Sequence, residues 1–200
     1  RTDYSGRINT NLNLFDGIVS IKANAEFRQA NRDSRNSAGT FNEALMLNPS
    51  IPLMDPDNES LYNVNGLGFG GSDFNPVADI KLREEEGRDQ WLLADALAKI
   101  RILDGFSLQS TIGIDKRMWY QYQYVKAAHK ESLDYARNGG ATQAYSNSTR
   151  INTETYFSYD KTFGDHKINT VAGYSFWQYE GEKFSASNYN FTVDGIGPWD

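Results

Sequence analysis

Apolar and polar residues alternate along most of the chain, in segments that a short turn joins into pairs. The first pair covers residues 4–14 and 18–28, with Asp16-Gly17 between the two segments. The apolar residues that share one parity within each segment are Tyr4, Ile8, Leu12 and Leu14, then Val19, Ile21, Ala23, Ala25 and Phe27. Asp-Gly between two alternating segments is a strong hairpin signal. The pattern therefore predicts a β-hairpin with one apolar and one polar face.

Two further hairpins are predicted downstream. In the second pair, apolar and polar residues alternate along 89–102 and 106–123, with Asp104-Gly105 between the two segments. Residues 143–161 and 167–180 form a third, less regular pair. The Ala-rich stretch 92–102 could also form a helix. A helical period would place Asp95 and Lys99 on one stripe with Ile102, so the strand interpretation fits better.

The connections between these segments alternate in length. The turns inside the hairpins are short, whereas 29–88 and 124–142 are long, polar and rich in Gly, Asn and Pro, and an irregular tail is expected from 181. Long structureless loops are uncommon in compact domains but typical of outer-membrane barrels. The sequence therefore predicts an all-β fold, in which antiparallel up-and-down hairpins form part of a transmembrane β-barrel with long extracellular loops.

The composition narrows the classes of function. The net charge of −6 argues against a nucleic-acid partner, which would require a basic surface. The absence of Cys excludes disulfides, thiolate metal sites and cysteine nucleophiles. The sequence has no apolar run of about 18 residues, so no transmembrane helix is predicted. The mean hydropathy of −0.63 is compatible with a barrel, because its strands alternate lipid-facing and water-facing residues.

Three segments of the chain carry family motifs: the first hairpin from Thr2 to Phe27, the sequence Asn75-Pro76-Val77-Ala78 before a strand, and Val171-Ala172-Gly173-Tyr174-Ser175-Phe176 with the residues that follow it. These segments resemble the SusC/RagA-like TonB-linked outer-membrane transporters of Bacteroidetes. The resemblance covers nearly the whole chain. It implies import of an oligosaccharide or peptide across the bacterial outer membrane, energised by TonB and assisted by a SusD-like surface lipoprotein.

The resemblance also sets the expected domain organisation. The family's N-terminal plug and closing strand have no counterpart in residues 1–200, which are expected to form a partial barrel of about six strands in three hairpins. The opening residues also lack an initiator Met, as expected for the middle of a longer protein. Contacts with the TonB complex are expected to lie in regions outside this chain, and membrane lipid is the expected neighbour of the apolar face.

No motif for catalysis or a cofactor emerges, so an enzyme is not expected. His129 and His166 are the only imidazoles, and no recognisable nucleophile accompanies them. Asp55-Pro56-Asp57-Asn58-Glu59 brings three carboxylates into one turn, but Ser60 and Gly66 occupy the positions where an EF-hand has its Gly and Glu. We interpret this turn as a solvated loop and keep loop-bound calcium as a minor alternative.

The aromatic sequence from Met118 to Tyr124 supplies the candidate ligand contacts. Tyr120 and Tyr122 share the parity of the apolar row and are expected in an interfacial aromatic girdle. Trp119 has the opposite parity and is expected to face the lumen. Rings stack on sugars and amides hydrogen-bond hydroxyl groups, so Trp119, Tyr124 and Asn147 are predicted to bind the ligand.

The polar rows define the surface that such a transporter would turn inward. The residues expected to contact a plug or line the lumen are Arg7, Asn11, Lys22, Glu26, Asp95, Lys99 and Arg101. The alternative to a membrane barrel is a soluble β-sandwich or jelly-roll carbohydrate-binding module. The apolar row distinguishes the two, because a sandwich packs it against a second sheet whereas a barrel exposes it to lipid.

Overall fold

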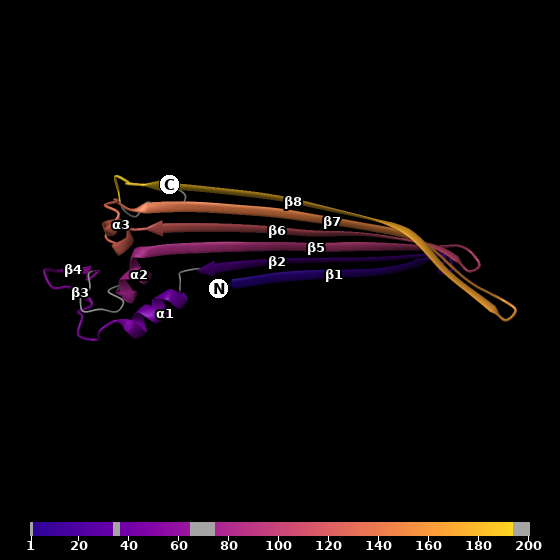
Figure 1. Cartoon of the computed structure of the whole chain (residues 1–200), viewed down its shortest axis with the longest axis horizontal. Helices are drawn as coiled ribbons and strands as arrows, with labels where there is room; N and C mark the ends of the chain where they lie inside the picture. Colours follow the sequence, from indigo (N-terminus) through magenta and orange to yellow (C-terminus); the bar gives the residue numbers. More distant parts are fainter. Residues whose placement is uncertain (1, 34–36, 65–74, 194–200) are drawn as a thin grey trace.

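The computed structural model describes residues 2–33, 37–64 and 75–193. The described part of the chain contains one long six-stranded sheet (Figure 1), in which every pair of neighbouring strands is antiparallel. In spatial order the strands are β1 (Thr2–Leu14), β2 (Val19–Asp33), β5 (Arg83–Leu103), β6 (Phe106–Val125), β7 (Gly140–Phe163) and β8 (His166–Tyr189). The spatial order follows the chain order, so the predicted up-and-down hairpins are confirmed.

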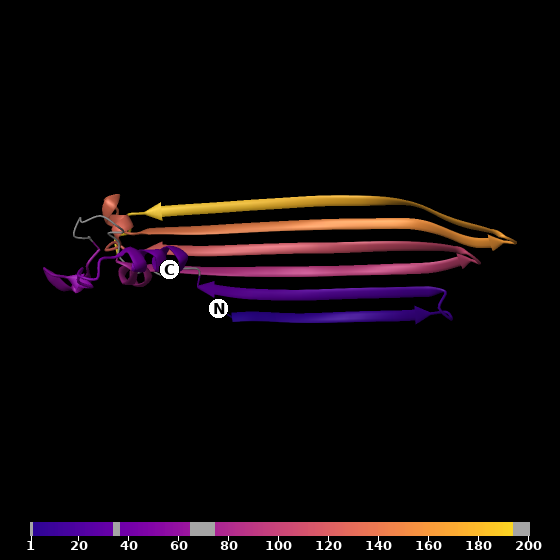
Figure 2. The same ribbon diagram turned by 60° about the horizontal axis from the view of Figure 1, so that its bottom comes forward.

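Short and long connections lie at opposite ends of the sheet (Figure 2). Both predicted Asp-Gly sequences lie in tight turns, and Gly17 and Gly105 have φ angles of 77° and 74°. Glycine adopts this left-handed region without steric cost. At Gly105 the space is restricted as well, because a Cβ atom there would lie 2.5 Å from the carbonyl oxygen of Asp160. The turn sequences therefore fix where the first two hairpins reverse.

The strands are longer than the alternation predicts. The expected irregular tail from 181 is wrong, because β8 continues to Tyr189, which pairs with Gly140. Polar residues occupy both faces of β8 beyond Gln178, so the apolar alternation fades while the backbone ladder with β7 continues. A strand that is polar on both faces gives no period-2 signal in the sequence.

The two long connections contain short regular elements instead of structureless loops. The first carries α1 (Ser37–Met46), the hairpin of β3 (Met54–Asp55) and β4 (Asn58–Tyr62), and α2 (Pro76–Leu82). The second carries α3 (Lys130–Asp134). None of the helices in the described ranges is long and apolar enough to cross a membrane. Asn75 caps α2 by accepting hydrogen bonds from Val77 and Ala78, with Pro76 at the first helical position.

The strand register gives the sheet two chemically different faces. Residues directly opposite each other in an antiparallel pair share a face. One row of such partners is Ile8, Ala25, Ala94, Ile114 and Ile151, and the neighbouring row on the opposite face is Arg7, Glu26, Leu93, Asp115 and Arg150. We call the face of Ile8 and Ile114 the apolar face and the face of Arg7 and Asp115 the polar face.

Among the described residues, no second sheet covers the apolar face. Ile8 is 71% exposed and Ile112 47% exposed, although both lie in the middle of long strands. Most buried residues lie instead at the end of the sheet that carries the long connections; they include Ala30, Val64, Ala78, Tyr122, Tyr124, Val125 and His129. This arrangement disfavours the sandwich alternative, whose apolar rows would pack against each other.

Candidate functional site

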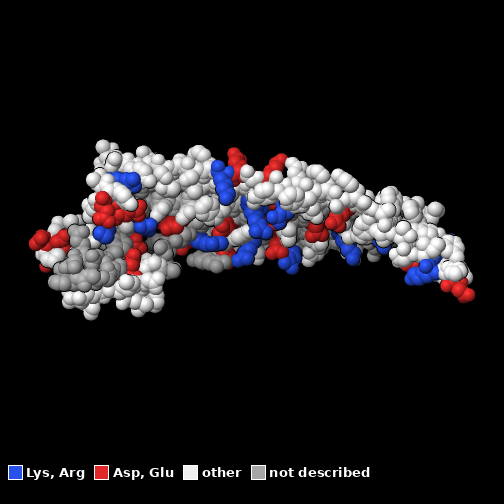
Figure 3. Space-filling model, in the orientation of Figure 1, with Lys and Arg blue, Asp and Glu red and all other residues white. Residues whose placement is uncertain are grey.

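The polar face carries a set of ion pairs and hydrogen bonds between β1, β2 and β5. Arg7 contacts Glu26, Arg28 lies 3.3 Å from Asp3, and the side-chain amide of Asn24 donates to Asp95 over 2.8 Å. Arg32 pairs with Asp89 at 2.5 Å. The seven residues predicted to form the inward row all lie on this face, so the register confirms that they share one side of the sheet. Figure 3 shows basic and acidic side chains intermingled along the sheet.

Aromatic rings lie among these charges. Trp119 is 38% exposed on the polar face, between Asp89 on β5 and Ser146 on β7. The guanidinium group of Arg28 lies 5.3 Å from the ring centroid of Trp91. Trp177 and Tyr179 also lie on this face, with parallel rings whose centroids are 6.5 Å apart. These further rings are not among the predicted contacts, although the parity of Trp177 relative to Phe176 indicates that Trp177 lies on the polar face.

The three predicted ligand-binding residues do not share one surface. Trp119 is on the polar face, whereas Asn147 lies opposite Met118 on the apolar face. Tyr124 is also on the apolar side of β6, but it is 1% exposed and its ring lies 6.0 Å from that of Phe191. A ligand that touches Trp119 on this sheet therefore meets a different set of neighbours from one at Asn147.

The expectation of an exposed girdle residue at Tyr122 is wrong for this chain. Tyr122 is 2% exposed, whereas a ring that anchors a barrel at the lipid interface must reach the surface. Tyr122 and Tyr124 lie at the end of β6, where Phe191 from beyond β8 packs against Tyr124. Parity identifies the side of the sheet, but it cannot show that a later segment packs over the end of a strand.

A buried polar cluster joins the two long connections. Asp79 of α2 accepts a hydrogen bond from the hydroxyl of Thr40 in α1 over 2.8 Å, and Nε2 of His129 lies 3.0 Å from its other oxygen. Nε of Arg83, the first residue of β5, lies 3.2 Å from the same carboxylate. Arg83 also donates to Glu131 of α3 over 2.9 Å. Three helices and one strand thus converge on a single buried carboxylate.

The hydrogen bonds of His129 define its tautomer and its role. Its Nδ1 accepts from the backbone amide of Glu131 over 3.1 Å, which caps α3, so Nε2 carries the hydrogen that is donated to Asp79. His129 is 1% exposed. From the sequence alone His129 is predicted to have no function, because nothing near it in the sequence reveals its partner 50 residues away.

The ionised form of Asp79 is favoured within this cluster. Burial alone raises the pKa of a carboxyl group, but the hydrogen bonds from His129 and Thr40 and the charge of Arg83 outweigh it, so the pKa of Asp79 lies below its ordinary value. Glu43 in α1 behaves in the opposite way, since burial and the neighbouring charge of Asp79 raise its pKa. The cluster therefore holds one firmly ionised acid at its centre.

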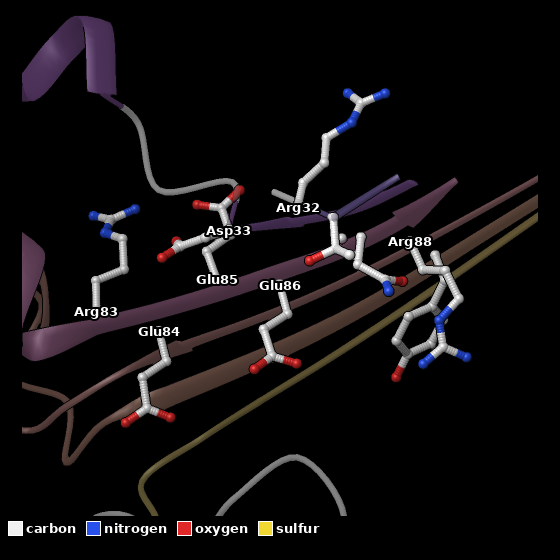
Figure 4. A pocket seen from close by; sticks show the side chains of 11 residues that line it. Arg32, Asp33, Arg83, Glu84, Glu85, Glu86 and Arg88 are labelled. Carbon is white, nitrogen blue, oxygen red and sulfur yellow. The ribbon is translucent and has the colours of Figure 1, made fainter. Parts of the chain in front are cut away.

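A charged pocket of about 480 Å³ lies where β2 ends beside β5. In Figure 4, Glu84 and Glu86 point to one side of the β5 backbone, while Arg83 and Glu85 point to the other. Gln121 on β6 donates to Glu85 over 2.5 Å. The acidic run therefore divides between the two faces of a strand and does not form one acidic site.

The predicted calcium alternative gains no cluster of ligands from the described residues. No group of three or more His, Asp or Glu side chains in those ranges is placed to hold a metal ion. Within the β3–β4 turn, Asp55 accepts a hydrogen bond from the backbone amide of Asp57 over 2.8 Å.

Comparisons with known proteins find similar sequences and structures among outer-membrane receptors and transporters. No family model matches the chain. It is 26% identical over 195 residues to the TonB-dependent receptor P3 of Formosa agariphila, an alignment that covers 97% of this chain and 19% of that receptor. Two solved structures of RagAB, described as a peptide transporter and as a peptide importer in the open-open state, match with TM-scores of 0.74 and 0.73 at 17% identity. They cover 97% and 98% of this chain and 22% of the matched chains.

The chain thus spans about a fifth of the length of the relatives it matches. The comparisons confirm the predicted resemblance to SusC/RagA-like transporters, the all-β barrel fold and the outer-membrane localisation. The relatives are receptors and transporters, not enzymes, as the sequence analysis predicts for this chain.

Proposed function

We propose that this chain forms six strands in the wall of an outer-membrane transporter that imports an oligosaccharide or peptide with energy supplied through TonB. The observation that carries this proposal is the two-faced sheet: Ile8 and Ile112 are exposed on one face, while ion pairs such as Arg28–Asp3 occupy the other. A single sheet with an uncovered apolar face is stable when lipid covers that face.

Closure of the barrel requires further strands of the same protein. The outer edges of β1 and β8 present unpaired backbone groups, which a membrane cannot satisfy with water. Plugged transporters have about 22 strands, so six strands form roughly a quarter of such a wall. The polar face then lines the lumen or contacts a plug, through residues such as Arg7, Lys22 and Asp95.

Trp119 is the proposed ligand contact on the luminal side. Its ring is partly exposed on the polar face near the end with the long connections, where a ligand enters. Asn147 and Tyr124, predicted as contacts from the sequence, lie on the other side of the sheet, which this proposal turns to lipid. Calcium at Asp55–Glu59 stays a minor prediction. The ligand class is open between sugars and peptides; RagAB is described as a peptide importer, and that description belongs to RagAB.

A partner at the extracellular end is part of the proposal. The RagAB matches are to a complex, which supports a SusD-like lipoprotein as the partner of this transporter. The cluster around Asp79 and His129 holds α1, α2 and the start of α3 together, which supports a docking surface at this end of the sheet.

The test is the depth-dependent cost of charge on the apolar face. In the full-length protein, Ile112→Lys and Ala96→Lys should impair assembly, since Lys or Arg near mid-membrane costs roughly 2–4 kcal/mol. The matched control is Thr111→Lys, which places the same charge one residue away on the polar face. Assembly is measured by heat-modifiable migration of the barrel in isolated outer membranes. Equal assembly of the three variants would contradict the barrel proposal.

A further inference from the structure

The apolar face changes character along each strand, and the position of this change draws a line across the sheet. Followed from the short turns, each strand of this face carries mainly apolar residues first and polar residues afterwards. The last apolar residues before the change, on β1, β2, β5, β6, β7 and β8 in turn, are Tyr4, Phe27, Leu92, Ile114, Ile151 and Phe176. We call the line through these six residues the apolar edge.

The apolar edge slopes across the sheet. Phe27 pairs with Leu92 and Ile114 pairs with Ile151, so the edge stays level at these two steps between strands. At each of the other three steps it drops by two residues, as where Leu92 pairs with Lys116 and not with Ile114. With about 3.3 Å per residue and about 4.8 Å between strands, the mean slope is about 40°. Strands of membrane barrels tilt by about 35–45°, and at that tilt the edge becomes level.

The apolar stretch also has the length of a membrane crossing. On the apolar face it covers Val19–Phe27, Phe106–Ile114, Ile151–Tyr159 and Ile168–Phe176, nine residues on each of these four strands. A transmembrane strand needs about 9–11 residues. Near the short turns the rings of Phe106 and Phe157 stack with centroids 5.7 Å apart, as in the aromatic girdle of a barrel. Length, slope and girdle together place the outer surface of the membrane at the apolar edge.

Lys116 is the charged residue that lies directly beyond the apolar edge. The first residues of the apolar face beyond the edge are Thr2, Gln29, Gln90, Lys116, Thr149 and Gln178, and Lys116 alone among them carries a charge. At the opposite edge of the apolar stretch, Lys161 lies 3.5 Å from a carboxylate oxygen of Asp104. Lys116 has no such carboxylate partner within the described part of the chain.

Polar groups of β7 lie beside the ammonium group of Lys116. Thr149 is directly opposite Lys116, and Asn147 is the next side chain of that face. The Oδ1 atom of Asn147 is buried and makes no hydrogen bond within the described ranges. An acid of the same row, Glu180, lies beyond Thr149 on β8 and accepts a hydrogen bond from Gln178 over 2.8 Å. It is two strands from Lys116, about 10 Å, a distance over which salt screens exposed charges.

We propose that Lys116 binds the phosphate group of a lipid in the outer leaflet, with Thr149 and Asn147 as neighbouring hydrogen-bonding groups. The methylene stem of Lys116 covers apolar surface beside Leu92, while its ammonium group reaches the level where lipid headgroups begin. A lipid phosphate supplies the anion that the described residues do not offer to Lys116. The proposal rests on the barrel proposed above, and it assigns Asn147 to the membrane surface instead of to the transported ligand.

The depth of the apolar edge is measured first, with single cysteines in the full-length protein. Residues 1–200 contain no cysteine, and any cysteine elsewhere in the protein is replaced by serine. Tyr174→Cys and Glu182→Cys, on the same face of β8, each carry a bimane label in vesicles of phosphatidylcholine with brominated acyl chains. Bromine should quench the label at Tyr174→Cys severalfold more strongly than the label at Glu182→Cys. Equal quenching of the two labels would overturn the inference.

Lipid binding is then measured by native mass spectrometry of the full-length protein in detergent. The probes are lipid A, the same lipid A after removal of its phosphate groups, and inorganic phosphate. Lipid A should bind roughly fivefold more tightly than its dephosphorylated form, equivalent to about 1 kcal/mol, as for one lysine near an anionic lipid surface. Higher ionic strength should reduce this preference. Equal affinity for the two lipids, or displacement of lipid A by an equal concentration of inorganic phosphate, overturns the proposal.

Variants assign the binding to Lys116. Lys116→Gln should remove most of the preference for phosphorylated lipid A, whereas Lys116→Arg should retain it. Lys161→Gln is the matched control, because Lys161 lies on the same face at the opposite edge of the apolar stretch. Heat-modifiable migration checks that each variant folds. A preference that persists in Lys116→Gln, or that is lost equally in Lys161→Gln, contradicts the assignment.

The outcomes separate this inference from the proposed function. Assembly of Ile112→Lys and Thr111→Lys tests the barrel without reference to lipid phosphate. A barrel that assembles and shows quenching at Tyr174→Cys, yet binds both forms of lipid A equally, refutes the lipid inference alone. Absence of quenching at Tyr174→Cys contradicts the barrel proposal as well, since this side chain lies in the middle of the apolar stretch.

Discussion

Nε2 of His129 donates a hydrogen bond to Oδ1 of Asp79 over 3.0 Å, and this bond joins the two long connections of the chain. Both residues are almost fully buried. The other oxygen of Asp79 accepts from Thr40, so α1, α2 and α3 are held together through one carboxylate. A carboxylate in this position contributes most through the buried donors that it satisfies.

Replacing Asp79 with Asn should loosen both connections at once. The amide lacks the charge that Arg83 requires and cannot accept at both former oxygens, so buried donors lose their partner. The expected loss is roughly 1–3 kcal/mol of local stability. Hydrogen exchange should speed up in both α1 and α3 while the strand amides of β5 and β6 stay protected. Asp57→Asn in the exposed β3–β4 turn is the control, and exchange that rises in α1 alone would contradict the joint role.

Acid should release the same cluster. The pKa of Asp79 is lowered below its ordinary value of 3.8, so its contribution is fully present above that value and is lost as the pH falls through the lowered pKa. The connections should therefore keep their protection from neutral pH down to about pH 4 and lose it only in stronger acid. Protease resistance of the connections, measured after exposure to a series of pH values, tests this.

The contribution of Glu43 to the acid response has the opposite sign. Because its pKa is raised above 4.5, protonation of Glu43 stabilises the fold, and this contribution is lost as the pH rises through the raised value. The acid transition of the Asp79→Asn variant lacks the contribution of Asp79, so comparing it with the transition of the native protein separates the effect of Asp79 from that of Glu43. An acid transition of equal size in both proteins would show that Asp79 does not cause it.

The sequence predicts the sheet well because its signals are local. Asp16-Gly17 and Asp104-Gly105 place the turns, and the alternation through Ile112 and Ile114 assigns the faces of the strands. The cluster at Asp79 is not predictable in this way, since Thr40, Asp79 and His129 are far apart in the sequence and each looks like an ordinary polar loop residue. The burial of Tyr122 has the same origin, because it depends on packing at the end of the sheet that parity does not encode.

A side chain at Gly105 should damage the second hairpin. The residue has a φ angle of 74°, and a Cβ atom would lie 2.5 Å from the carbonyl oxygen of Asp160 on β7. Backbone strain of this kind costs on the order of 1–3 kcal/mol. Gly105→Ala should therefore lower the fraction of assembled barrel in outer membranes. Gly6→Ala is the control, because a Cβ atom there meets no atom within 4 Å; equal assembly of the two variants would contradict the steric argument.

Trp119 and Asn147 offer a test of which face of the sheet meets the ligand. The register places Trp119 opposite Ser146, and Asn147, the next residue along β7, lies opposite Met118 on the other face. Because adjacent residues of a strand point to opposite faces, the two side chains cannot both line one lumen. Trp119→Ala should reduce uptake of the cognate nutrient roughly tenfold, equivalent to about 1.4 kcal/mol of lost binding. Asn147→Ala should leave uptake near the native level, with both variants equally abundant in the outer membrane. Uptake of labelled nutrient by intact cells measures this difference, and loss of uptake in Asn147→Ala alone would assign the ligand to the opposite face.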